Sequence, residues 1–192
     1  MGKQKIGDFI FSEQNILNRL RVEYMSNPVY AIANLFVFLW ESDFLLKTKA
    51  GYWYEVEVKI SSSDFKNDRK NKPEKFDILE GRKSGLRPNY FSYCVPDLLL
   101  DKVSDIIPSY AGICIVNSHG HIVHIRMPHQ LHGDKISDDS LNLLEKFYYN
   151  YSNLRWKEDN KDDIIKQLRM ENSRLRAEYK AIVGEPIYDS VI

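Results

Sequence analysis

Residues 41–60 read ESDFLLKTKAGYWYEVEVKI, a pattern that predicts two paired β-strands. The runs from Phe44 to Thr48 and from Tyr52 to Ile60 are rich in β-branched and aromatic residues, which are enriched in strands. Between them, Ala50-Gly51 supplies a glycine at the point where the chain must reverse. We therefore expect a β-hairpin.

The second of these runs carries a charged residue at every other position, at Glu55, Glu57 and Lys59. Because successive side chains on a strand point to opposite faces, these three share one face and the intervening valines share the other. If the valines are anchored in a core, two carboxylates and an ammonium group converge on the opposite side. Thirteen residues separate Asp43 from Glu57, and the hairpin would bring the two carboxylates close together.

These side chains suit the hydrolysis of phosphodiester bonds, which uses a divalent cation to polarise the phosphate and to lower the pKa of an attacking water. Mg²⁺ prefers oxygen ligands such as those of Asp43 and Glu57. Lys59 would position the water or stabilise the charge that develops on the phosphate. The spacing alone also fits a solvated strand face with an incidental ion pair. Glu41 and Glu55 have the same parity and could replace or assist the ligands.

Elsewhere the pattern predicts further helices and strands. A helix is expected from the N-cap residue Ser12 to about Met25, where Asn27-Pro28 breaks it, and a second helix is expected to start near Ser63. The other expected elements are strands at 35–39, 90–95, 111–117 and 121–126, a loop at 103–108, and helices at 137–153 and 159–183. The predicted fold class is α/β.

Taken in order, these segments resemble the PD-(D/E)XK nuclease superfamily. The set Asp43…Glu57-Val58-Lys59 is similar to its D…E-x-K signature, and residues 60–66, ISSSDFK, are similar to a run in its small bacterial and phage DNA-repair-like branch. The likeness covers roughly residues 10–155 and includes RPNYF (87–91), CVP (94–96) and PSYAGI (108–113). The chain departs from the signature at Ser42, where the name of the superfamily has a proline, and at Phe76, where related sequences often carry a histidine.

The resemblance implies a restriction-endonuclease-like mixed sheet flanked by helices, dependence on Mg²⁺ or Mn²⁺, and DNA as the substrate. The implied function is a metal-dependent deoxyribonuclease in DNA repair, recombination or phage DNA metabolism, with an endonuclease favoured over an exonuclease. Its implied catalytic residues are Asp43, Glu57 and Lys59, of which the two carboxylates hold the metal. The alternative is a catalytically inactive nucleic-acid-binding module with the same fold.

An acid on the first helix often completes the metal site in this superfamily, and Glu13 matches that position. Independently of the family, Glu13 lies at helical spacing from Leu17 and Leu20, which predicts that its side chain points inward at the sheet. The resemblance therefore adds Glu13 to the expected catalytic and metal-binding residues. The alternative is an acidic first-turn residue that the helix dipole favours.

The segment from Lys59 to Arg87 holds nine basic residues against five acidic ones, a net charge of +4, although the whole chain has 27 of each. Such a local excess of positive charge is expected to contact the phosphates of DNA. The candidate DNA-binding residues are Lys66, Arg69, Lys70, Lys72 and Lys75. Asp64 is either the N-cap of a helix or an accessory residue of the active site.

Residues 158–192 are expected to form a helical tail behind a nuclease domain of residues 1–157. Six residues recur in this tail at intervals of 3, 4, 3, 4 and 3, the spacing of a coiled-coil seam. They are Ile165, Leu168, Asn172, Leu175, Tyr179 and Ile182. A homodimer through this helix is expected, and the alternative is that the helix folds back onto its own domain.

The composition favours a cytoplasmic protein without a membrane anchor. The longest apolar run, residues 29–40, is about twelve residues long, whereas a bilayer needs roughly 20. No apolar stretch of signal-peptide type follows the N-terminal residues. Cys94 and Cys114 are too few for a disulfide framework and are expected to be reduced core residues.

Overall fold

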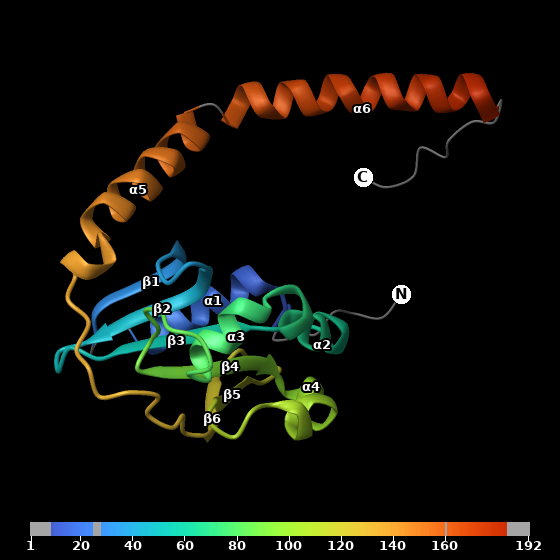
Figure 1. Ribbon diagram of the computed structural model, residues 1–192. Helices are drawn as coiled ribbons and strands as arrows, with labels where there is room; N and C mark the ends of the chain where they lie inside the picture. Colours follow the sequence, from blue (N-terminus) through green and yellow to red (C-terminus); the bar gives the residue numbers. More distant parts are fainter. Residues whose placement is uncertain (1–8, 25–27, 160, 184–192) are drawn as a thin grey trace. The chain divides into compact units, whose positions relative to one another are not determined.

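A computed structural model describes residues 9–24, 28–159 and 161–183 (Figure 1). The chain divides into two compact units, Met1–Lys146 and Phe147–Ile192. The first unit holds a β-sheet with helices on both of its faces, and the described residues of the second unit are helical. The chain is thus an α/β protein, as its sequence predicts.

The sheet has six strands in the order β1-β2-β3-β4-β5-β6. The pairs β1–β2, β2–β3 and β5–β6 are antiparallel, whereas β3–β4 and β4–β5 are parallel, so the sheet is mixed. The strands are β1 (Pro28–Phe36), β2 (Glu41–Thr48), β3 (Trp53–Val58), β4 (Tyr90–Pro96), β5 (Gly112–Val116) and β6 (Ile122–Arg126). Because β3 has neighbours on both sides, the polar residues that it carries lie in the middle of the sheet.

One face of the sheet is covered by α1 (Glu13–Glu23). The Ser12 side chain caps this helix, as expected, by accepting a hydrogen bond from the N–H of Asn15. The helix buries three apolar residues against one face of the inner strands, on which Val56 and Val58 lie. The core on this side consists of Ile16, Leu17, Leu20, Phe44, Leu46, Val56, Val58, Cys94, Cys114 and Val116. Both cysteines are free and buried, as the sequence predicts.

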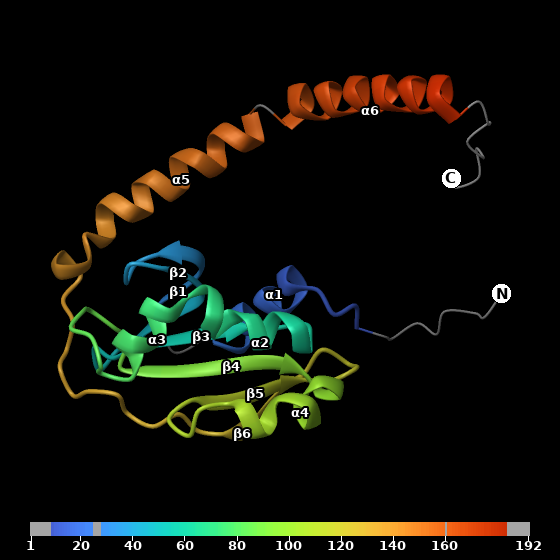
Figure 2. The ribbon, with the colours of Figure 1, turned by 45° about the vertical axis from the view of Figure 1, so that its right-hand side comes forward.

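The opposite face of the sheet lies under α2 (Ser62–Asn71) and α3 (Pro73–Leu79) (Figure 2). Phe65 of α2 packs its ring 4.6 Å from that of Tyr93. Cys94, the next residue of β4, lies in the core on the α1 side, so Tyr93 faces the opposite side of the sheet. Lys72 separates the two helices, because the proline that follows it favours the first turn of a new helix. The chain changes direction between α2 and α3, so that Lys75 of α3 contacts the side chains of β3.

The structure differs from the expected elements at β1, in the segment before residue 108, and at α5 (Leu143–Asp159), which the sequence places at 137–153. β1 begins at Pro28 rather than at 35, so the predicted strand of residues 35–39 covers only its end. The region before residue 108 contains α4 (Asp97–Val103) and a 3₁₀ turn (Ser104–Ile106), whereas the sequence predicts a loop at 103–108. Leu99 and Val103 of α4 are buried at helical spacing.

The second unit contains most of α5 (Leu143–Asp159) and the whole of α6 (Lys161–Val183), and a 3₁₀ turn at Asp139–Leu141 precedes α5. The sequence placed the division after residue 157, whereas the contacts divide the chain after Lys146. Within the described ranges, no helix is both long and apolar enough to cross a membrane.

Candidate active site

The end of the β2–β3 hairpin brings Asp43 to β3. Regular pairing of the two strands stops at Phe44 opposite Val56. Beyond that point the Asp43 Oδ2 accepts a hydrogen bond of 2.7 Å from the N–H of Val58. A side chain thus replaces a backbone carbonyl as the acceptor, and it holds the Asp43 carboxylate beside the strand that carries Glu57.

Glu57 lies fully buried between the sheet and the two helices above it. Its Oε1 accepts from Lys59 Nζ at 2.9 Å and from Lys72 Nζ at 2.8 Å, and its Oε2 accepts from Lys75 Nζ at 2.5 Å. Burial alone would raise the pKa of Glu57, but Lys75, Lys59 and Lys72 outweigh it and hold the pKa well below its usual value. Glu57 is therefore a permanent anion with both oxygens engaged.

Lys59 is held between two carboxylates. Besides Glu57, its Nζ contacts Asp68 Oδ1 at 3.1 Å, and Asp68 is a buried residue of α2. Burial would lower the pKa of Lys59, but these two anions raise it above its usual value. Lys59 is accordingly a fixed cation at the end of β3.

The sequence pattern alone does not predict a role for Asp68. Its side chain is only 2% exposed, and its Oδ2 has no hydrogen-bond partner among the described residues. One signal was available, since Asp68 lies three residues after the buried Phe65 and therefore on the inner side of α2. An unpaired buried carboxylate oxygen is costly, so this atom is a candidate to receive a cation or a water.

Lys75 joins Glu57 to Glu55, the other buried carboxylate of β3. Its Nζ lies 2.7 Å from Glu55 Oε1, and Trp40 Nε1 donates to the same oxygen at 2.9 Å. The ammonium group also lies over the rings of Trp40 and Phe91, 5.6 and 5.1 Å from their centroids. Burial raises the pKa of Glu55, and Lys75 opposes that rise. Glu55 is thus part of an ion-paired core rather than a free ligand.

Asp43 differs from Glu57 in its protonation. Burial, reinforced by the negative charge of Glu57, raises the pKa of Asp43 to about 7, against 3.8 for an ordinary aspartate. The hydrogen bond from Val58 and the charges of Lys59 and Lys75 only partly offset this rise. Two neighbouring carboxylates that repel each other are an arrangement that a divalent cation relieves.

The fit of these residues to a metal ion is partial. The described residues contain no group of three His, Cys, Asp or Glu side chains arranged to hold a metal. Asp43 and Glu57 supply hard oxygen atoms, but both oxygens of Glu57 already carry ammonium groups. A cation at Glu57 must therefore displace a lysine. Lys72, with a side chain 37% exposed, can swing into solvent, whereas Lys75, at 1%, cannot.

The remaining candidate acids lie apart from this cluster. Glu13 is exposed, so the prediction that it points inward is wrong: it stands in the first turn of α1, beyond the part of the helix that the sheet covers. Glu41 is exposed at the start of β2. Asp64 is half exposed, and its Oδ1 lies 3.9 Å from Lys59 Nζ, at the rim of the cluster.

The five candidate DNA-binding residues are divided by the structure. Lys66, Arg69 and Lys70 are exposed on α2, and Arg69 pairs with Glu80 at 2.7 Å. Lys72 is half-buried at Glu57, and Lys75 is buried. The prediction that Lys75 contacts DNA is therefore wrong, because the turn at Pro73 directs this residue into the carboxylates of β3.

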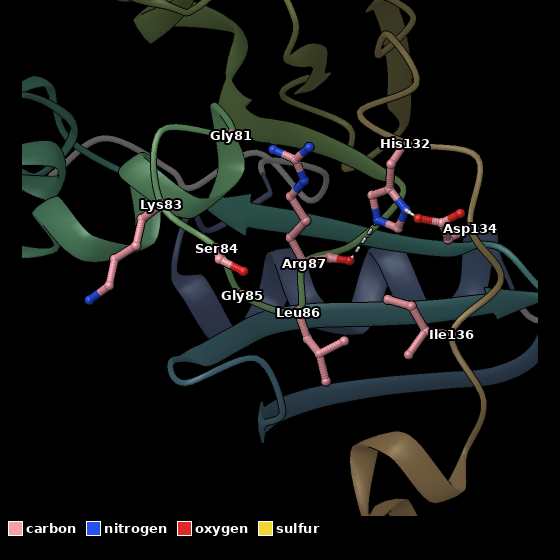
Figure 3. Close-up of a pocket in the computed structure, with 9 residues that line it drawn as sticks. All are labelled: Gly81, Lys83, Ser84, Gly85, Leu86, Arg87, His132, Asp134 and Ile136. Carbon is pink, nitrogen blue, oxygen red and sulfur yellow. Dashed lines mark hydrogen bonds and ion pairs between the residues drawn. The ribbon is translucent and has the colours of Figure 1, made fainter.

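A cavity of about 400 Å³ lies between the loop after α3 and the loop before α5 (Figure 3). It has basic residues, but their charges are engaged within the fold. Arg87 donates to the carbonyls of Ile78 and Leu79 at 2.8 Å each, and Lys83 pairs with Glu74. Arg87 thus fastens a loop, and this cavity is not the candidate active site.

Comparison with known proteins identifies a solved structure with a similar fold, and it assigns no activity to the chain. No protein-family model matches the chain, and no curated protein matches it. Among solved structures, the chain is similar to SPO1766, a protein of unknown function from Silicibacter pomeroyi, with a TM-score of 0.53 and 14% sequence identity. The likeness covers 80% of this chain and 96% of that one. At this identity the likeness concerns the fold alone.

Proposed function

We propose that the protein is a Mg²⁺- or Mn²⁺-dependent deoxyribonuclease of the PD-(D/E)XK superfamily, with a restriction-endonuclease-like fold. The observation that carries the proposal is the convergence of Asp43, Glu57 and Lys59 at the end of the β2–β3 hairpin, on the sheet face away from α1. These are the three positions at which the sequence resembles the superfamily's signature. The resemblance favours an endonuclease acting on repair, recombination or phage DNA, and the sequence pattern favours a cytoplasmic location.

The roles of the chain's own residues follow from their environment. Asp43 and Glu57 would hold the metal, which supplies a polarised phosphate and a more acidic water. Lys59 keeps its proton because Glu57 and Asp68 surround it, so it would stabilise negative charge on the phosphate. Asp43 must lose its proton before it can bind a cation, and its raised pKa makes that step sensitive to pH near neutrality.

One observation favours the second candidate, a nucleic-acid-binding module without turnover. Glu57 is neutralised by three lysines, which is an arrangement that needs no metal. In this case the exposed lysines of α2 would bind DNA while the buried charges serve only the fold.

Supercoiled plasmid incubated with Mg²⁺, Mn²⁺ or EDTA distinguishes the two candidates. Metal-dependent nicking that disappears in Glu57→Gln and persists in Glu74→Gln supports the nuclease, since Glu74 is an exposed acid 57% accessible on α3. Retarded plasmid without cleavage supports the binding module. If the plasmid is neither cut nor retarded, both candidates are contradicted.

We further propose a homodimer through α6. Four apolar residues of its predicted seam are exposed in the chain: Leu168, Leu175, Tyr179 and Ile182. Burying such side chains against a second copy would remove their apolar surface from water. A dimer would carry two active sites, which suits the cutting of both strands of a duplex.

A further inference from the structure

The apolar stripe of α6 is open to a partner along most of its length. Leu168, Leu175, Tyr179 and Ile182 are 60, 54, 52 and 84% exposed. A shallow groove of about 530 Å³ follows the same side of the helix and is lined in part by Ile165 and Leu168. The stripe therefore offers one continuous seam rather than scattered surface residues.

The spacing of the seam assigns the heptad positions. With Ile165 at position a, Leu168 and Leu175 fall at d, and Asn172 and Tyr179 fall at a. The five positions alternate by three and four residues without a break. A second helix with the same spacing can pack its own a and d residues between them.

The charges beside the seam are sorted by side. The e positions hold Arg169 and Arg176, and the g positions hold Glu171 and Glu178, all of them exposed. In a parallel pair, a g residue faces the e residue of the next heptad on the other helix, so Glu171 of each copy meets Arg176 of the other. In an antiparallel pair, arginines face arginines and glutamates face glutamates. Charge complementarity thus selects a second copy in parallel orientation.

Asn172 supplies the register. In a parallel pair without offset, the two Asn172 amides face each other and can exchange a hydrogen bond. In an antiparallel or shifted pair, each amide would face an apolar side chain and lose a partner on burial. We infer that α6 pairs with α6 of a second copy in parallel and in register, with a Glu171–Arg176 ion pair on each side. The inference rests on the proposed homodimer and is independent of the nuclease activity.

Charge reversal in the full-length chain tests the orientation by sedimentation equilibrium. Glu171→Arg and Arg176→Glu should each raise the dimer dissociation constant about tenfold, because two symmetric attractions become repulsions. The double variant should restore it to within about twofold of the parent. Lys166→Glu, at the outward b position, is the matched control and should leave the constant unchanged. Tighter association of either single variant indicates an antiparallel pair and overturns the inference while leaving the homodimer intact.

Cysteine crosslinking gives a second, independent readout. Leu175→Cys should form an interchain disulfide under mild oxidation, because residues at d face their own copies in a parallel pair. Ser173→Cys, at an outward b position, should remain a monomer on non-reducing gels. The native Cys94 and Cys114 are buried and do not contribute. Equal crosslinking of both variants, or a parent chain that stays monomeric at high micromolar concentration, contradicts the inference, and the monomer also removes the homodimer.

Discussion

Asp43 accepts a 2.7 Å hydrogen bond from the backbone N–H of Val58, and this contact fixes the place of a carboxyl group whose pKa is about 7. The N–H of the next residue, Lys59, is bonded instead to the carbonyl of Cys94 on β4. Alternate N–H groups of β3 thus point to opposite neighbours, and the one facing β2 is satisfied by a side chain. The chain thereby places a proton-holding group beside the permanently charged Glu57.

Replacing Asp43 by Asn should change the pH dependence of stability. The folded state holds the Asp43 proton more tightly than the unfolded state, whose pKa is near 3.8. The free energy of unfolding therefore falls as pH rises from about 4 to 7, and the penalty is complete above that window. Asparagine cannot ionise, so the variant should be more stable than the parent by about 4 kcal/mol at pH 8 and nearly equal to it at pH 4.

Urea titrations at pH 4, 6 and 8 measure this difference. Glu41→Gln, which removes an exposed carboxylate from the same strand, is the matched control and should show the parent's pH dependence. A constant difference between Asp43→Asn and the parent at all three values would show that the carboxyl does not titrate near neutrality.

Glu57→Gln and Lys59→Ala should each lower cleavage by at least about 100-fold if the proposed function holds. Glu57→Gln should also lower the free energy of unfolding by about 3 kcal/mol, because it leaves the buried Lys75 and Lys59 with less compensating charge. Rates must therefore be compared below the melting transition, at equal folded fraction by circular dichroism. Cleavage by folded Glu57→Gln at the parent's rate would refute the assignment.

The sequence predicts local features of this site well and distant ones poorly. Alternation on β3 and the hairpin turn place Glu57 and Lys59 on one face with Asp43 nearby, since both features depend on neighbouring residues. Lys75 could not be predicted in the same way. It stands in a polar segment that is typical of a solvated surface, and only the turn at Pro73 and the packing of α3 direct it to Glu57. The exposure of Glu13 and the burial of Lys75 both depend on which part of each helix lies over the sheet, and local sequence does not specify that position.

The exposed lysines of α2 should govern the salt dependence of DNA binding. Replacing Lys66 and Lys70 together by Ala should weaken binding similarly for all sequences and flatten the plot of log K against log salt by roughly 1.8, about 0.9 per lost phosphate contact. Lys75→Ala should instead lower the urea concentration at which the protein unfolds, because its ammonium group is buried. The folded variant should show the parent's slope of log K against log salt. Fluorescence anisotropy at several salt concentrations measures both. An unchanged slope in the double variant would place the DNA path elsewhere.

Lys72 should compete with the metal for Glu57. Its Nζ lies 2.8 Å from Glu57 Oε1, and its side chain, 37% exposed, is the one ammonium group of the three with room to leave. Lys72→Ala removes one of the two ammonium groups at that oxygen while Lys59 and Lys75 still compensate the charge, so Mn²⁺ should bind about fivefold more tightly. Lys70→Ala, which removes an exposed lysine of α2 two residues before Lys72, controls for the general loss of positive charge. Electron paramagnetic resonance of free Mn²⁺ gives the affinity without reference to cleavage. Equal affinities in the two variants would show that Lys72 does not occupy the metal's place, and no Mn²⁺ binding by any of the proteins would remove the metal from the proposed function.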